Sequence, residues 1–447
     1  MHILILNGSP KGENSITLQT LYYLQKKNPG HSFEVLHVGQ KIKSLEKNFA
    51  PALEALEKAD VLLFSYPVYT FIAPCQLHRF IALMKEHAAP VSGKIATQVT
   101  TSKHFYDVTA HRYIEDNCAD LGLHYIRGLS ADMEDLTTEK GRREAENWFA
   151  HFCWSAEKRY FAPVYPTPAA TPVVPVTPLE NTGSKPGDVV IIADLAPGDT
   201  QLAGMIARFR ARLPYATRIV NLREYPFRGG CLGCFRCAVS GKCVYADGFD
   251  DFLRNKIQTA DAMVYAFPIR DHSMGHLFKM YDDRQFCNGH RTVTIGMPVG
   301  YLVSGNYSRE VNLQTIIEGR SQVGCNILTG VATDEFDTDA AIDRLAENLD
   351  YALQHKNTGP QNFYGIGGMK IFRDLIYQMR GFMRADHKFF KSHGQYDFPQ
   401  KKWPQSLAMY LVGAMIANPK LQSKMGSQMN EGMLMPYKKV LQDMDKK

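Results

Sequence analysis

An internal repeat constrains the fold of this chain most strongly, because one pattern of apolar runs occurs twice along its 447 residues. Residues 59–67 are matched almost position for position by residues 260–268, and residues 3–10 are matched in register by residues 189–197. A chain of this length also exceeds what one ordinary hydrophobic core accommodates. The sequence therefore predicts two copies of one domain.

Apolar runs and helical segments alternate through the first copy. Runs at 3–6, 33–37, 61–65, 94–99 and 124–129 are typical of buried strands, and the segments between them, such as 110–121, have helical spacing. This alternation predicts a parallel, doubly wound sheet, hence an α/β fold. In the second copy, residues 291–298 echo 94–102 and residues 330–335 echo 128–134.

Composition divides the remainder of the chain. Residues 161–186 form a Pro-rich run without periodicity, which predicts an extended linker. We therefore expect domains at 1–160 and 187–355, and a helical C-terminal extension at 356–447.

The first strand runs into a loop rich in hydroxyl groups. Gly8, Ser9 and Pro10 require a sharp turn, and a helical pattern opens near Ser15. The free amides and dipole of a helix N-terminus favour an anion, to which Ser9, Ser15 and Thr17 add hydroxyl groups and Lys11 a charge. Because the nucleotide signatures Gly-x-Gly-x-x-Gly and Gly-x-x-x-x-Gly-Lys-Ser/Thr are absent, the loop suits the monophosphate of FMN. The alternative is an ordinary βα turn shaped by Gly, Ser and Pro.

A second loop follows the strand at 61–65 and carries Pro67, Val68, Tyr69, Thr70 and Phe71. Loops at neighbouring strand ends flank a switch point, where open α/β sheets bind ligands. Tyr69 and Phe71 offer flat apolar surface to an isoalloxazine ring.

These two loops resemble those of the flavodoxin-like NAD(P)H-dependent FMN reductases. That family's Gly-Ser-Pro, basic residue and Asn-Ser/Thr are present as Gly8 to Lys11 with Asn14 and Ser15, and its Pro-Val-Tyr loop is present as Pro67 to Tyr69. The resemblance implies two tandem flavodoxin-like domains, with FMN in the first. It implies that the phosphate and ring are bound by Ser9, Lys11, Asn14, Ser15, Thr17, Pro67, Val68, Tyr69, Thr70, Phe71, Thr101 and Ser102.

The second copy lacks the phosphate-binding residues. Leu195, Ala196, Pro197 and Gly198 replace Gly8 to Lys11, and Asp199 follows them. A carboxylate repels a phosphate, so we do not expect flavin in this copy.

The second copy has a cysteine run instead, formed by Cys231, Cys234, Cys237 and Cys243. Compact Cys-x2-Cys-x2-Cys spacing favours a [4Fe–4S] cluster, whereas zinc usually takes two separated pairs; zinc and free thiols remain alternatives. The run resembles the cysteine motif of iron–sulfur flavoproteins, including its position before Asp250 and Asp251.

Other polar residues invite competing interpretations. Five cysteines outside the run have the pattern of ordinary core residues: Cys75, Cys118, Cys153, Cys287 and Cys325. A redox role remains open for Cys75, which lies beside the flavin loop in the sequence. His272 and His276 are expected on one helix with the i,i+4 spacing of metal ligands, but no third ligand is nearby, which favours surface or interface histidines. Lys103 and His104 are equally well explained as a pocket wall or as a solvated loop.

The C-terminal segment is basic, with 14 Lys or Arg residues against 6 Asp or Glu residues in 361–447. No nucleic-acid module accompanies it, so we expect no nucleic-acid partner. The helical repeat at 369–383 predicts an amphipathic helix packed over the domains, with a membrane surface or an acidic redox protein as alternative partners. Residues 407–416 predict a buried helix that completes the second domain.

No signal peptide or bilayer-spanning run is evident, and nine cysteines suit a reducing compartment, so we expect a cytoplasmic protein. The resemblance implies an NAD(P)H-dependent FMN oxidoreductase that passes electrons to a small acceptor of quinone, flavin or nitro type. A redox protein partner and a homo-oligomer remain open. The alternative is a non-enzymatic flavin and iron–sulfur electron carrier; a repressor or scaffold would require an empty first domain.

Overall fold

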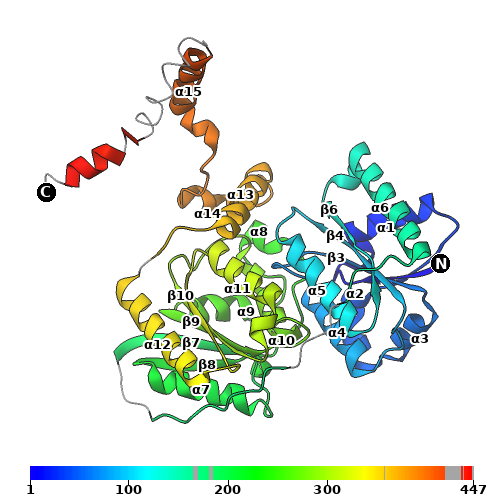
Figure 1. The fold of residues 1–447 in the computed structure, drawn as a ribbon, viewed down its shortest axis with the longest axis horizontal. Helices are drawn as coiled ribbons and strands as arrows, with labels where there is room; N and C mark the ends of the chain where they lie inside the picture. The colour runs from blue at the N-terminus through cyan, green and yellow to red at the C-terminus, as the bar shows by residue number, and fades with distance from the viewer. Residues whose placement is uncertain (165–169, 181–184, 357, 418–433, 436, 445–447) are drawn as a thin grey trace. The chain divides into compact units, whose positions relative to one another are not determined.

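The computed structural model describes residues 1–164, 170–180, 185–356, 358–417, 434–435 and 437–444. It has two compact units, Met1–Phe389 and Phe390–Lys447. Figure 1 follows the chain through the two sheets of the first unit.

The first sheet has the strand order β2-β1-β3-β4-β5, and β6 pairs with β4. Its strands, all paired in parallel, are β1 His2–Asn7, β2 Ser32–Leu36, β3 Val61–Pro67, β4 Ile95–Ser102, β5 His124–Tyr125 and β6 Leu129–Asp132. Its helices are α1 Ile16–Lys27, α2 Val38–Lys47, α3 Ala50–Lys58, α4 Cys75–Glu86, α5 Asp107–Asp120 and α6 Glu139–Lys158. This order is that of a flavodoxin-like sheet, as the sequence predicted.

The second sheet repeats this topology, with the order β11-β10-β9-β7-β8. Its strands are β7 Lys185–Ala193, β8 Tyr215–Asn221, β9 Ala262–Pro268, β10 Pro298–Ser304 and β11 Ile327–Thr333. Its helices are α7 Thr200–Arg212, α8 Arg236–Ser240, α9 Phe249–Phe252, α10 Gly275–Arg284, α11 Val311–Val323 and α12 Thr338–His355. The tandem α/β fold is therefore confirmed.

The two copies share one core. Alternate side chains of β1 point to opposite faces, so Ile3 and Ile5 pack with α1 and α6, whereas Leu4 and Leu6 join a second cluster. That second cluster is continuous with Val190 and Ile192 of the second sheet. Equivalent helices meet across it, α4 against α10 and α5 against α11. The repeat thus packs as an internal pseudo-dimer.

Two predicted strands differ in extent. Residues 291–297 hold no strand, because Gly296 turns the chain at φ 75° and β10 begins only at Pro298. The predicted strand at 124–129 is divided into β5 and β6 around Gly128, where a Cβ atom would lie 2.3 Å from the carbonyl oxygen of Gln98.

Three helices follow the second copy: α13 Phe363–Gln378, α14 Arg384–Ser392 and α15 Trp403–Ile416. Helix α13 packs against α11 and buries Arg373 and Ile376, which confirms the packed helix predicted there, although Arg373 is not solvated as expected. The prediction of a buried helix at 407–416 is wrong, because Leu407, Met409, Tyr410 and Leu411 of α15 are each more than half exposed. No helix among the described residues is both long and apolar enough to cross a bilayer.

Candidate functional site

The loop between β1 and α1 forms an anion-binding corner. Ser9, Ser15 and Thr17 are buried there, and Ser15 immediately precedes the first turn of α1. The hydroxyl oxygen of Ser15 is buried without a hydrogen-bond partner among the described residues. A buried hydroxyl group without a partner is destabilising unless a ligand satisfies it. The corner therefore suits a phosphate group.

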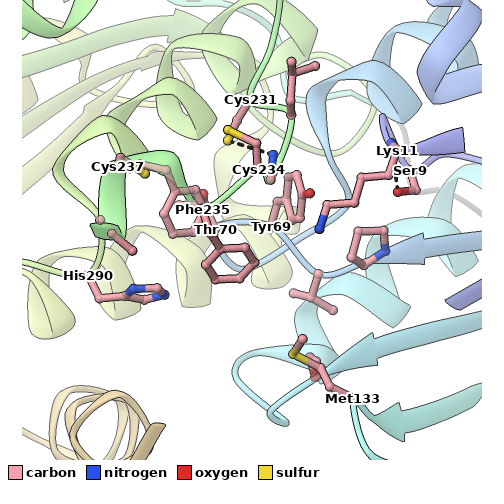
Figure 2. A pocket seen from close by; sticks show the side chains of 18 of the residues that line it. Ser9, Lys11, Tyr69, Thr70, Met133, Cys231, Cys234, Phe235, Cys237 and His290 are labelled. Atoms are coloured by element: carbon pink, nitrogen blue, oxygen red, sulfur yellow. Dashed lines mark hydrogen bonds between the residues drawn. The ribbon is translucent and has the colours of Figure 1, made fainter. Parts of the chain in front are cut away.

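The loops after β3 and β4 line the same cavity as this corner. Pro67, Val68, Tyr69 and Thr70 come from the first loop, and Thr101 and Ser102 end β4. The hydroxyl oxygens of Thr17 and Thr101 lie 2.6 Å apart, which ties the phosphate corner to the end of β4. Three strand ends of the first copy thus converge on one cavity (Figure 2).

The opposite wall of the cavity is the cysteine loop of the second copy. Cys231, Cys234, Cys237 and Cys243 all line it, and Figure 2 shows three of these side chains beside Tyr69 and Phe235. All nine cysteines are free thiols. Burial raises the pKa of Cys231, and it raises the pKa of Cys237 to about 11.

The four cysteines do not form a metal site in this arrangement. Among the described residues, no three His, Cys, Asp or Glu side chains are grouped so that they could hold a metal ion. One positive group nevertheless lies beside the run, because a guanidinium nitrogen of Arg284 is 4.0 Å from the Sγ atom of Cys243.

Lys11 connects the two walls. Its Nζ atom lies 5.4 Å from the centre of the Phe235 ring, and Figure 2 shows its side chain extending past Tyr69. Burial lowers the pKa of Lys11, while negative charge on Cys234 and Cys231 would raise it. Lys11 therefore faces the cysteine loop as well as the phosphate corner.

Several lining residues were not predicted from the sequence. They are Phe105, Met133, Phe235, Tyr245, Arg284, Phe286, Cys287, His290, Ile371, Phe372 and Leu375. The last three belong to α13, whose apolar spacing was recognised but interpreted only as packing. Cys287 was expected to be an ordinary core residue. Only the pairing of the two copies brings these residues to the flavin loops.

Two predicted ligands lie outside the cavity lining. Asn14 is exposed in the turn Gly12–Asn14, and Phe71 is buried against Phe105 and Tyr106 at ring-centre distances of 5.1 and 4.1 Å. Lys103 does reach the lining, but its Nζ atom is 2.8 Å from a carboxylate oxygen of Asp132.

The predicted histidine pair is divided between a loop and a helix. His272 precedes α10, which starts at Gly275, so the assumed helical spacing of His272 and His276 is wrong. The ring nitrogens of His272 each lie 3.0 Å from a carboxylate oxygen, one of Asp120 and one of Glu310. As the sequence suggested, His272 is an interface histidine.

The corresponding corner of the second copy is satisfied by its own side chains. A carboxylate oxygen of Asp199 accepts a hydrogen bond from the amide of Ala196 at 2.9 Å and lies 3.3 Å from a guanidinium nitrogen of Arg270. The linker runs past the ends of β10 and β11 in this copy. There the Thr171 amide donates to the side chain of Asn306 at 2.8 Å, and the Val174 amide donates to the Asp334 carbonyl at 2.9 Å. This corner thus holds a carboxylate where the first copy offers free donors.

Comparison with known proteins shows what the first copy is similar to. Residues 1–130 match the family model of NADPH-dependent FMN reductase. The first copy is therefore similar to an NADPH-dependent FMN reductase domain, as the two loops indicated.

One curated relative and several solved structures are similar to parts of the chain. An iron–sulfur flavoprotein of Archaeoglobus fulgidus is 25% identical over 175 residues, which cover 37% of this chain and 78% of that protein. An FMN-dependent NADH-azoreductase of Bacillus anthracis in complex with FMN is 12% identical, covering 34% of this chain and 99% of its own, with a TM-score of 0.28. The NAD(P)H:acceptor oxidoreductase FerB of Paracoccus denitrificans is 16% identical, covering 35% and 97%, with a TM-score of 0.30.

Proposed function

We propose that the protein is an FMN oxidoreductase that takes electrons from NAD(P)H or a reduced carrier and passes them to a small acceptor. The observation that carries this proposal is the single cavity bounded by three flavin-type loops of the first copy and the cysteine loop of the second. The family match of residues 1–130 supports FMN as the cofactor and NAD(P)H as the donor.

The residues of the cavity divide into phosphate and ring positions. Ser9, Lys11, Ser15 and Thr17 bind the phosphate in this proposal, and residues 67–70 with Thr101 and Ser102 hold the ring. FMN supplies hydride acceptance when bound, so the protein needs no acid–base pair of its own for that step. What the chain supplies is the position of the flavin between the two walls of the cavity.

The walls beyond the flavin loops suggest the class of acceptor. Phe105, Phe235, Phe286 and Phe372 are aromatic, and Met133, Ile371 and Leu375 are aliphatic or thioether side chains. Such walls favour flat molecules, because an aromatic ring system can stack on aromatic side chains. We therefore propose an acceptor of the quinone, flavin or nitro type.

We also propose that the four-cysteine run holds a [4Fe–4S] cluster. Its support is the Cys-x2-Cys-x2-Cys spacing, the position of all four thiols on one cavity wall and the similarity to an iron–sulfur flavoprotein. Iron and sulfide assays of anaerobically purified protein test it. Cys234→Ala should lose the iron, whereas the matched variant Cys153→Ala, altered in α6, should retain it. Equal iron content in the two variants would refute the cluster.

Steady-state turnover tests the enzymatic function. The FMN-loaded protein should oxidise NADH or NADPH continuously when a quinone or a nitro compound is present, and much more slowly without one. An FMN-loaded protein that accepts electrons only from a reduced carrier protein, and passes none to these acceptors, would favour the non-enzymatic electron carrier. The basic segment at 361–447 is the observation that keeps this second function in view.

We place the protein in the cytoplasm, because nine unpaired cysteines suit a reducing compartment.

A further inference from the structure

The loop that the flavin ring would contact has an unusual backbone. Thr70 and Phe71 adopt φ values of 44° and 76°, in the left-handed region that residues with a side chain rarely occupy. The loop is closed by two hydrogen bonds of its own, from the Tyr69 amide to the Ile72 carbonyl at 2.9 Å and the reverse at 3.2 Å. A left-handed conformation of this kind persists only where its surroundings stabilise it.

A buried ion pair of the second copy contacts this loop. The Nζ atom of Lys279 donates to the Tyr69 carbonyl at 2.8 Å. Asp283 accepts from the amide of Cys75 at 2.8 Å and from the hydroxyl group of Thr70 at 3.3 Å. Lys279 and Asp283 also pair with each other, one helical turn apart on α10, and both are 0% exposed.

Buried charges destabilise a protein unless they are paired and fully hydrogen-bonded. Here the hydrogen bonds beyond the ion pair are directed at the other copy, at Tyr69 and Thr70 of its loop and at the amide of Cys75, where α4 begins. Asp282 extends the network, because it lies 3.5 Å from Lys279 and 2.5 Å from a guanidinium nitrogen of Arg320.

The reciprocal contact is different. In the register that matches Pro67 with Pro268, Lys279 corresponds to His78 and Asp283 to Ala82. His78 is buried, and both of its ring nitrogens are without a hydrogen-bond partner among the described residues. The loop of the second copy is contacted instead by Lys85, whose Nζ atom is 3.0 Å from a carboxylate oxygen of Asp271. The buried pair of Lys279 and Asp283, which we call the charge clamp, thus contacts the loop of the copy that has the open phosphate corner.

We propose that Lys279 and Asp283 are positioning residues for FMN, which hold the Tyr69–Thr70–Phe71 loop in its binding conformation from the opposite copy. This inference rests on the proposed function, since it names the residues that prepare its flavin site. It makes the second copy a determinant of flavin affinity although its own corner is closed.

The experiment measures FMN affinity and stability separately. Apoprotein is titrated with FMN by quenching of flavin fluorescence, and its thermal unfolding is followed without FMN. The variant Lys279→Met with Asp283→Leu removes the pair without leaving one charge unpaired. The matched control is Lys85→Met, which breaks one contact between copies at the other loop, the ion pair with Asp271.

The double variant should bind FMN about tenfold more weakly than wild type, while Lys85→Met should bind it as wild type does. Equal FMN affinity in all three folded proteins would overturn the inference. If the double variant does not fold, Lys279→Met alone decides, because burial already raises the pKa of Asp283 and protonation can remove its charge. Unchanged FMN affinity in that single variant would likewise overturn the inference.

The proposed function fails in a different way. If wild-type apoprotein binds no FMN, the assignment of the cofactor is wrong, and the effect of the clamp on FMN affinity is refuted with it. If wild type binds FMN and the variants bind it equally well, only the clamp is wrong.

Discussion

The two copies have the same strand order and the same contacts between equivalent helices, yet their anion corners have opposite chemistry. In the first copy, the buried hydroxyl group of Ser15 lacks a partner among the described residues. In the second, Asp199 occupies the equivalent turn and pairs with Arg270. Topology alone therefore does not make a flavin site. Free donors at the helix N-terminus are also needed, and one copy has replaced them with its own carboxylate.

The comparison predicts that a carboxylate placed in the first corner should close it. Ser15→Asp should weaken FMN binding at least about a hundredfold, because two like charges about 4 Å apart near a surface repel by about 4 kcal/mol. The folded state should persist, because Asp is a favourable residue before a helix. Fluorescence titration measures the affinity, and Ser15→Ala is the control, with a loss of about tenfold. Near-wild-type affinity in Ser15→Asp would place the phosphate elsewhere.

The contact between Tyr69 and the cysteine loop should tolerate no added side chain. A Cβ atom on Gly233, which has φ 59°, would lie 1.8 Å from the Tyr69 hydroxyl oxygen. Gly233→Ala should therefore displace Tyr69 and weaken FMN binding about tenfold, or about 1.4 kcal/mol. Gly248→Ala is the matched control, because Gly248 has φ 73° but nothing within 4 Å of the added atom. The control should lose stability only. Equal FMN affinities of Gly233→Ala and Gly248→Ala would show that Tyr69 does not contribute to the flavin site.

The stability of the protein should depend on pH through His272, which lies at the interface between the two copies. Burial opposes protonation of His272, but hydrogen bonds to Asp120 and Glu310 outweigh it and raise its pKa to about 10 from an ordinary 6.5. A raised pKa stabilises the fold fully below about pH 6.5, and this stabilisation is lost as the pH rises toward about 10. The thermal midpoint of wild type should therefore fall over that range, and His272→Gln should flatten the decline. An identical decline in His272→Gln would contradict this role; His151→Gln, an exposed histidine of α6, is the control.

The smallest effect is expected at Asn14. Because its side chain is exposed and outside the cavity lining, Asn14→Ala should change FMN affinity by less than about twofold. A larger loss in the fluorescence titration would show that the loop closes around bound phosphate and that the prediction from the sequence motif is correct.

The sequence was sufficient to predict the repeat, the parallel doubly wound sheets and most of the residues that line the first copy's side of the cavity. Local patterns carry this information, since apolar runs such as residues 61–65 and turns such as Gly8 to Pro10 act over a few residues. The other cavity wall depends on packing between distant segments. Phe372 lies 4.4 Å from Phe105, ring centre to ring centre, across more than half of the chain, and no local signal specifies that pair.

The charge clamp was missed for the same reason. Lys279, Asp282 and Asp283 have the composition of a solvated helix face, and only the pairing of α10 with the first copy buries them. The strand expected at 291–298 was misplaced because it was aligned with residues 94–102 of the first copy, whereas Gly296 turns the chain and β10 begins at Pro298. Buried polar contacts between the two copies are therefore the features that were hardest to predict from this sequence.

A structure of the protein determined with bound FMN tests the central claim most directly. We expect one flavin per chain, with its phosphate at Ser15 and its ring between the Tyr69 loop and the cysteine loop. A flavin at Asp199 of the second copy, or two flavins per chain, would contradict it.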